Sequence, residues 1–181
     1  TGLHPAIGLC IRYRGQVVID RTIGHQSGNS PGDFPHSAPV LATPETYFNM
    51  FSASKVVTAM LIHLLDDRGL VHLDDAVVEY IPEFGAHGKH HVTIRHVLRH
   101  RCGIPTTTKV TIDLDIISNH EAILELICDS KPGAGAGRRM AYHALTGGYV
   151  LAEIIQRVTG KPIRQVLDEE IRQPLGFQSF N

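Results

Sequence analysis

The chain has 181 residues, of which 43% are hydrophobic, and both values suit one globular domain with a sizeable core. Its 17 Lys and Arg balance 18 Asp and Glu, without a basic block among aromatic residues, so nucleic acid is not an expected partner. No apolar run reaches the roughly 20 residues of a membrane-spanning helix, and no secretory signal pattern opens the chain. The three cysteines, Cys10, Cys102 and Cys128, share no close spacing, which argues against a disulfide framework. We therefore expect a cytoplasmic location.

Residues 5–24, PAIGLCIRYRGQVVIDRTIG, predict a β-hairpin. Apolar residues alternate along both halves, and Arg14-Gly15 supplies the turn. Because an isolated hairpin is marginal in water, we expect it to pack on helices or on further strands. Residues 27–44 are rich in Ser, Gly and Pro and are interpreted as a long loop, either a surface connection or one wall of a site.

Residues 48–65, FNMFSASKVVTAMLIHLL, predict an amphipathic helix with a short buried lead-in. The apolar residues at helical spacing are Val56, Val57, Met60, Leu61, Leu64 and Leu65. The lead-in consists of Phe48, Met50 and Phe51, and Arg68-Gly69 is expected to end the helix.

Ser52 and Lys55 lie three residues apart at the start of this helix. Residues at this spacing share a helix face, so the Lys55 ammonium can approach the Ser52 hydroxyl. The free N–H groups of a first helical turn also favour negative charge there. This geometry suits a nucleophile with a nearby base, although a Ser N-cap followed by an ordinary helix Lys gives the same spacing.

The remaining segments predict helices joined by turns. LVHLDDAVVEYIPEF forms a short helical turn closed by Pro82, in which Asp74 and Asp75 are interpreted as caps and surface charges rather than as metal ligands or acid catalysts. Three more helices are predicted: one from about His120 capped by Ser118 or Asn119, one ended by Gly160, and one starting at Pro162.

No cofactor or metal is expected. His96, His100 and Cys102 suggest a zinc site, but neither the Glu of an H-E-x-x-H motif nor a paired cysteine spacing is present. The glycines of residues 131–139 do not fit G-x-G-x-x-G, so a phosphate-binding loop is disfavoured. The chain also lacks G-x-S-x-G, which disfavours an α/β-hydrolase.

Four ordered segments together resemble the serine β-lactamase-related family, which includes penicillin-binding-protein-like enzymes, class C β-lactamases and family VIII carboxylesterases. They are FSASKVVTAM, residues 64–84, VTIRHVLRHRCGIP and residues 140–177, and they cover nearly the whole chain. The resemblance implies a β-lactamase/transpeptidase-like α+β fold with Ser52 as nucleophile and Lys55 beside it. It also places His100 in a structural turn written His-x-Ser-Gly, where Cys102 replaces the Ser.

Tyr142 lies where the resemblance places a Tyr-x-Asn triad, and it becomes the expected general base and acid. Without the resemblance, a half-buried aromatic anchor is the better interpretation. The triad here is Tyr142-His143-Ala144, so the Asn is absent. The resemblance therefore favours the esterase branch over recognition of amides. Whether Lys55 or Tyr142 takes the Ser52 proton is open at this stage.

The third motif of the family, a Lys-Thr-Gly-type strand, has no counterpart after Tyr142. We therefore expect residues 1–181 to be a single partial domain from the N-terminal part of a longer hydrolase, with the C-terminal sheet strands missing. Its hairpin and loop occupy residues 1–50, and a mainly helical region follows at 51–181. This piece alone is expected to be weakly active or inactive.

Three functions follow from the resemblance. The preferred one is a serine hydrolase that cleaves small carboxylic esters through an acyl-enzyme on Ser52. A D-alanyl-D-alanine carboxypeptidase or β-lactamase would use the same residues on amides or β-lactam-like substrates. A non-catalytic homologue would keep only the fold.

Overall fold

The computed structural model describes residues 4–29, 38–107, 114–178 and 180. The chain divides into two compact units, Thr1–Met50 and Phe51–Asn181, and each is described here by itself. The expectation of one partial domain over residues 1–181 is not tested by this division and stays a prediction.

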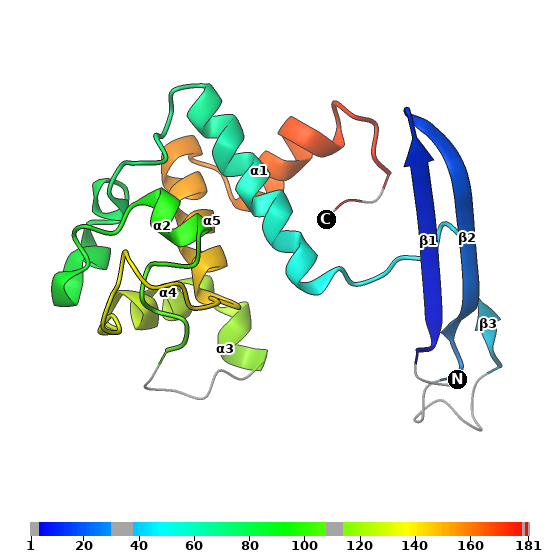
Figure 1. The fold of residues 1–181 in the computed structure, drawn as a ribbon, viewed down its shortest axis with the longest axis horizontal. Coiled ribbons are helices and arrows are strands. Elements are labelled where there is room, and N and C mark those ends of the chain that lie inside the picture. Colours follow the sequence, from blue (N-terminus) through cyan, green and yellow to red (C-terminus); the bar gives the residue numbers. More distant parts are fainter. Residues whose placement is uncertain (1–3, 30–37, 108–113, 179, 181) are drawn as a thin grey trace. The chain divides into compact units, whose positions relative to one another are not determined.

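The first unit is built on an antiparallel pair of strands, β1 (Ala6–Tyr13) and β2 (Gln16–Ser27), drawn in blue in Figure 1. Arg14 and Gly15 connect them with φ values of 50° and 80°. Two successive positive φ angles are typical of the tight turns whose twist matches that of a hairpin. The predicted hairpin and its turn are therefore confirmed.

A third strand, β3 (Val40–Leu41), pairs antiparallel with the end of β2. The interpretation of residues 27–44 as loop throughout is thus wrong at this point, while residues 30–37 lie outside the described part. Two residues are too few to show an alternating pattern, so no periodicity indicates this strand.

The strands of this unit carry many exposed apolar side chains, including those of Ile7, Leu9 and Ile23, which are 51%, 50% and 66% exposed. No helix occurs among the described residues of this unit, so no second layer within it covers the sheet.

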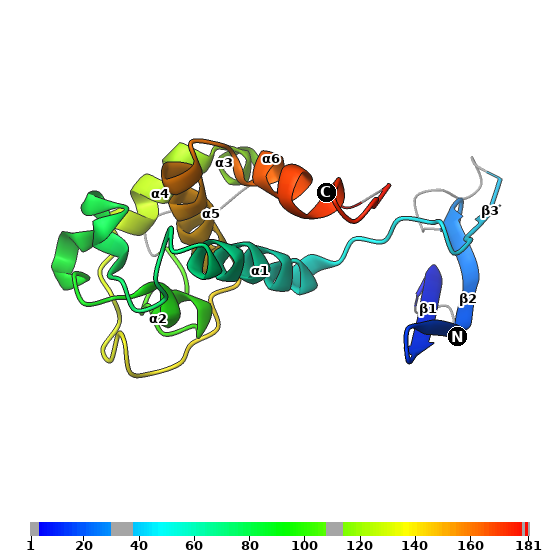
Figure 2. The same cartoon turned by 90° about the horizontal axis from the view of Figure 1, so that it is seen from above.

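The second unit is organised around two helices, α1 (Ser54–Asp67) and α5 (Thr146–Thr159), which pack against each other. Figures 1 and 2 show α1 crossing α5, with the N-terminal turns of α1 extending beyond it. The buried residues at the centre of this packing are Leu61, Ile62, Leu65, Val150, Ile154 and Ile155. Helix α5 ends at Gly160, whose φ is 71°, as the sequence predicts.

Shorter elements complete the helical unit. The α-helices are α2 (Ile94–Leu98), α3 (Leu114–Ser118), α4 (His120–Cys128) and α6 (Ile163–Leu167), and a π-helical turn, Asp168–Arg172, follows α6. Three 3-10 segments cover Phe51–Ala53, Val77–Glu79 and Pro82–Gly88. The side chain of Asn119 accepts a hydrogen bond from the Ala122 N–H at 3.1 Å, so Asn119 is the cap of α4.

Two details of the prediction for this unit are wrong. The predicted short helical turn is present at Val77–Glu79, but Pro82 does not close it: Pro82 starts the next 3-10 segment, because its fixed φ and missing N–H suit a first helical position. In α1, Val56 and Met60 are 70% and 40% exposed, whereas Ile62, outside the predicted stripe, is completely buried. The first turns of α1 extend past α5, so apolar spacing there does not lead to burial.

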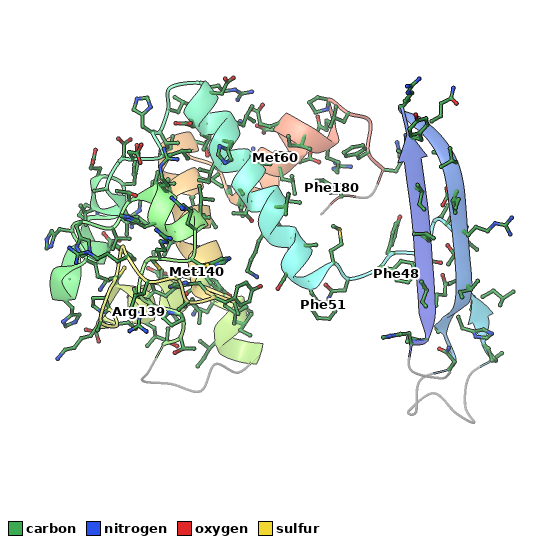
Figure 3. The ribbon with its side chains drawn as sticks, in the orientation of Figure 1. Phe48, Phe51, Met60, Arg139, Met140 and Phe180 are labelled. Carbon is green, nitrogen blue, oxygen red and sulfur yellow. The ribbon has the colours of Figure 1, made fainter. Side chains whose placement is uncertain are left out.

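The predicted buried lead-in is also wrong. Phe48, Met50 and Phe51 are 46%, 53% and 79% exposed. Figure 3 shows Phe51 at the N-terminal end of α1, with Met60 further along the same helix.

Lys89 links the 3-10 segment Pro82–Gly88 to the end of α4. Its side chain is completely buried, and Nζ donates hydrogen bonds to the carbonyl oxygens of Ala86, Cys128 and Ser130 at 2.7, 2.8 and 2.8 Å. Carbonyls at a helix C-terminus lack intrahelical partners, and a cation is favourable beside them. The buried Lys89 side chain therefore caps the C-terminus of α4.

We predict that Lys89→Met lowers the free energy of unfolding by about 3 kcal/mol, because two buried hydrogen bonds and one part-buried hydrogen bond to carbonyls are lost while the side-chain volume stays similar. Urea unfolding followed by circular dichroism at 222 nm measures this change. Lys131→Met is the matched control, since Lys131 is exposed. Equal stability of the two variants would contradict a structural role for Lys89.

Candidate active site

Ser52 is the middle residue of the 3-10 turn Phe51–Ala53, and this turn directly precedes α1. The prediction of a first-turn position is therefore right in substance, although the turn is 3-10. Phe51 adopts a φ of 45°, which is uncommon for a bulky residue and marks the sharp entry into the turn. Ser52 itself is exposed, so its hydroxyl is open to solvent and to small molecules.

Lys55 follows on the next turn and points back at the serine. Its Nζ donates a hydrogen bond to Ser52 Oγ over 3.2 Å. This contact is the one that the spacing of three residues predicts, because such residues share a helix face.

Tyr142 reaches the same hydroxyl from a segment 90 positions further along the chain. Its OH lies 2.6 Å from Ser52 Oγ, and Lys55 Nζ lies 5.2 Å from the centre of the Tyr142 ring. The structure therefore brings Ser52, Lys55 and Tyr142 together, and the Ser52 oxygen lies between an ammonium and a phenol.

These contacts change the acidity of the phenol. The hydrogen bond with Ser52, and after it the Lys55 ammonium, lower the pKa of Tyr142 from its ordinary value. Both neighbours favour the charged phenolate, which is the form that accepts a proton. The geometry thus supplies a weak acid whose conjugate base is stabilised beside a serine hydroxyl.

The segment that carries Tyr142 is irregular and is held on the turn that follows α2. The Ala141 N–H donates to the His100 carbonyl at 2.9 Å. On the other side of Tyr142, the His143 imidazole is 1% exposed, and its Nε2 accepts a hydrogen bond from the Ile104 N–H at 3.0 Å. Burial lowers the pKa of His143, so its neutral form, which can accept this bond, is favoured.

Sequence reasoning missed the contributions of His100 and His143. His143 stands at the middle position of the triad, where no motif assigns it a role, and the sequence indicates His100 only as a candidate zinc ligand or as part of a structural turn. The third triad position is occupied by Ala144, which is exposed, so no side-chain amide is present there.

The other acidic and histidine candidates have structural partners. Asp74 forms an ion pair with Arg95 at 2.6 Å, and Asp75 accepts hydrogen bonds from the His72 N–H and the Tyr80 hydroxyl. His96 Nδ1 accepts from the Thr93 N–H at 3.1 Å at the start of α2.

The described part of the chain contains no group of three or more His, Cys, Asp and Glu side chains placed to hold a metal ion. Among the same residues, no helix has both the length and the apolar character needed to span a membrane. A surface hollow of about 510 Å³ is lined by His91, His96 and residues 135–138. Ser52, Lys55 and Tyr142 do not line it.

Comparison with known proteins gives consistent results. Residues 2–181 match the family model described as Beta-lactamase. Over 126 residues, or 70% of this chain, the sequence is 40% identical to the esterase/beta-lactamase LipL of Mycobacterium tuberculosis, of which the match covers 29%.

Two solved structures resemble the chain closely. The crystal structure of a penicillin-binding protein homologue from Caulobacter crescentus is 31% identical, with a TM-score of 0.81 over 94% of this chain and 43% of that one. The crystal structure of a family VIII carboxylesterase is 27% identical, with a TM-score of 0.78 over 93% of this chain and 43% of that one. These likenesses confirm the predicted β-lactamase/transpeptidase-like fold. The chain spans less than half the length of these proteins.

We predict that Lys55→Met and Ser52→Ala each raise the pKa of Tyr142 toward its ordinary value of 10.0, because each removes a group that stabilises the phenolate. The measurement is an NMR titration of tyrosine ¹³Cζ resonances, with the Tyr142 signal assigned through Tyr142→Phe. Lys131→Met serves as the control and is expected to leave the titration unchanged. If Lys55→Met leaves it unchanged too, the electrostatic coupling described above is wrong.

Proposed function

Because the chain belongs to the beta-lactamase family, whose members include esterases and other hydrolases, we propose that it provides the nucleophilic half of a serine hydrolase that cleaves small carboxylic esters. The observation that carries this proposal is the contact of one serine oxygen with both a lysine and a tyrosine. Ser52 Oγ lies 3.2 Å from Lys55 Nζ and 2.6 Å from the Tyr142 OH. A nucleophile within hydrogen-bond reach of its base is the recurring arrangement of covalent catalysis.

Ser52 would attack the carbonyl carbon of the ester and form an acyl-enzyme. Tyr142, as phenolate, would take the hydroxyl proton during the attack, and Lys55 would keep the phenolate stable. As the tetrahedral intermediate collapses, the bond to the alcohol oxygen breaks and Tyr142 returns the proton to that oxygen. Water, activated by the same phenolate, then attacks the acyl carbon and releases the acid with Ser52 restored.

The oxygen of the substrate carbonyl becomes negatively charged in this step. The backbone N–H of Ser52 would supply one of the donors that stabilise it, since the turn at Phe51–Ala53 precedes a helix and its N–H groups favour negative charge. One such donor is typically worth about 3 kcal/mol of transition-state stabilisation.

Esters are favoured over amides because of Ala144. A side-chain amide at this position would lie next to Tyr142 and could hold a substrate amide carbonyl, but alanine has no donor. Esters carry a better leaving group than amides and depend less on a donor that holds the carbonyl.

The second candidate function, a peptidase or β-lactamase, would use the same Ser52 and Lys55. It draws support from the match to the penicillin-binding protein homologue.

The decisive experiment is intact-protein mass spectrometry after exposure to p-nitrophenyl acetate and, separately, to a fluorophosphonate. We predict one covalent adduct on the wild-type chain and none on Ser52→Ala. Ser54→Ala is the matched control, because Ser54 is an exposed serine two residues away at the start of α1. Retention of the adduct in Ser52→Ala would disprove the assignment of the nucleophile.

Ala144→Asn tests the ester preference. We predict that it raises the rate of acylation by a chromogenic cephalosporin roughly tenfold relative to p-nitrophenyl acetate, because it adds one hydrogen-bond donor for an amide carbonyl. The ratio of the two rates is measured in the same preparation, so changes in the amount of active protein cancel. An unchanged ratio would remove Ala144 as the reason for the preference.

A further inference from the structure

We propose that His100 is a positioning residue for Tyr142 and that His143 fixes His100 in that role. The proposal rests on the proposed function only in assigning Tyr142 a part in catalysis. It concerns residues outside Ser52, Lys55 and Tyr142, and it is carried by four contacts between His100 and the segment 141–143.

The first two contacts hold the backbone on both sides of Tyr142. The His100 carbonyl accepts from the Ala141 N–H at 2.9 Å, and His100 Nδ1 accepts from the His143 N–H at 3.3 Å. The residue between two anchored neighbours has little freedom to rotate its peptide planes. Tyr142 therefore leaves the segment in a fixed direction, toward Ser52.

The third contact is between rings. The centres of the His100 and Tyr142 rings are 4.9 Å apart, with an angle of 58° between their planes. Aromatic rings at this separation and tilt attract each other. Tyr142 is 54% exposed, so few other groups hold its ring, and the contact with the imidazole restrains it.

His143 keeps the imidazole of His100 in place. The two rings are nearly parallel, with a 10° angle and a centre separation of 6.0 Å. His143 is itself anchored, because its Nε2 accepts from the Ile104 N–H and its side chain is buried. Tyr142 is thus connected through His100 to a buried and hydrogen-bonded imidazole.

The backbone conformation of His100 restricts which residues can replace it. Its φ is 56°, in the left-handed region that few residues other than Gly, Asn and Asp adopt readily. Two variants are compatible with this φ. His100→Gly removes the imidazole ring with its Nδ1 acceptor and leaves the backbone unstrained. His100→Asn keeps a side-chain acceptor near the position of Nδ1 and tolerates the same φ.

The test measures kcat and KM for p-nitrophenyl acetate and the pKa of Tyr142 by ¹³Cζ NMR in both variants. In His100→Gly we expect kcat to fall roughly ten- to a hundredfold with little change in KM, since misplacing a catalytic group by about 1 Å has effects of this size. The pKa of Tyr142 is expected to rise because its contact with Ser52 loosens. His100→Asn is expected to recover part of both losses.

His63→Ala is the matched control, because His63 is exposed on α1. It is expected to behave like the wild type. An unchanged pKa of Tyr142 in a folded His100→Gly variant would overturn the positioning role, and so would equal effects of His100→Gly and His63→Ala. The two proposals also fail separately: retention of the covalent adduct in Ser52→Ala contradicts the proposed function, while the NMR titration still decides whether His100 positions Tyr142.

Discussion

The arrangement around Ser52 depends on the attachment of one irregular segment to another. Residues 141–143 are held on the turn at 100–104 by main-chain and imidazole hydrogen bonds, and this attachment brings Tyr142 to a serine 90 positions earlier in the chain. Neither segment is a helix or a strand, so no regular backbone hydrogen bonding holds its conformation. They are fixed because the flanking helices α2 and α5 pack together, and because Thr146 at the start of α5 donates to the Ile104 carbonyl at 2.6 Å. The packing of α2 against α5 thus determines the geometry around Ser52, because the two irregular segments are attached to these helices.

Lys89 likewise attaches two segments through hydrogen bonds, at a place away from Ser52. Lys89 satisfies carbonyls from two segments that approach each other only in the folded chain. A buried cation is acceptable there because three oxygens replace its water, although burial still lowers the pKa of Lys89. Both attachments use side chains that no sequence motif singles out for this role, one lysine and two histidines that lie 43 positions apart.

This explains which parts were predictable from the sequence. The hairpin, the cap at Asn119 and the end of α5 at Gly160 follow from local rules of turns and caps, and the structure agrees with them. The approach of Lys55 to Ser52 is also local, being set by helical spacing. Tyr142 is different, because no spacing rule connects it to Ser52 and only resemblance to a family suggested it.

The errors have a common physical cause. Val56 and Met60 fit an apolar helical stripe, yet spacing states only which residues share a face and not where a partner lies. β3 is too short to carry a pattern, and the functions of His100 and His143 depend on a contact between segments that are distant in sequence. Local chemistry therefore predicted the elements well, whereas burial and long-range contacts required the three-dimensional arrangement.

The bond between Ser52 and Tyr142 has a direction, and the direction depends on which oxygen holds the proton. Lys55 can only donate to Ser52 Oγ, so it occupies one lone pair of that oxygen in either case. While Tyr142 is a neutral phenol it can also donate to Ser52, which draws electron density away from the serine oxygen. Once Tyr142 is a phenolate it can only accept, and the serine becomes the donor. Ionisation of one phenol thus reverses the direction of the hydrogen bond across a 2.6 Å contact, and in the proposed reaction this reversal is what would prepare the serine oxygen for attack.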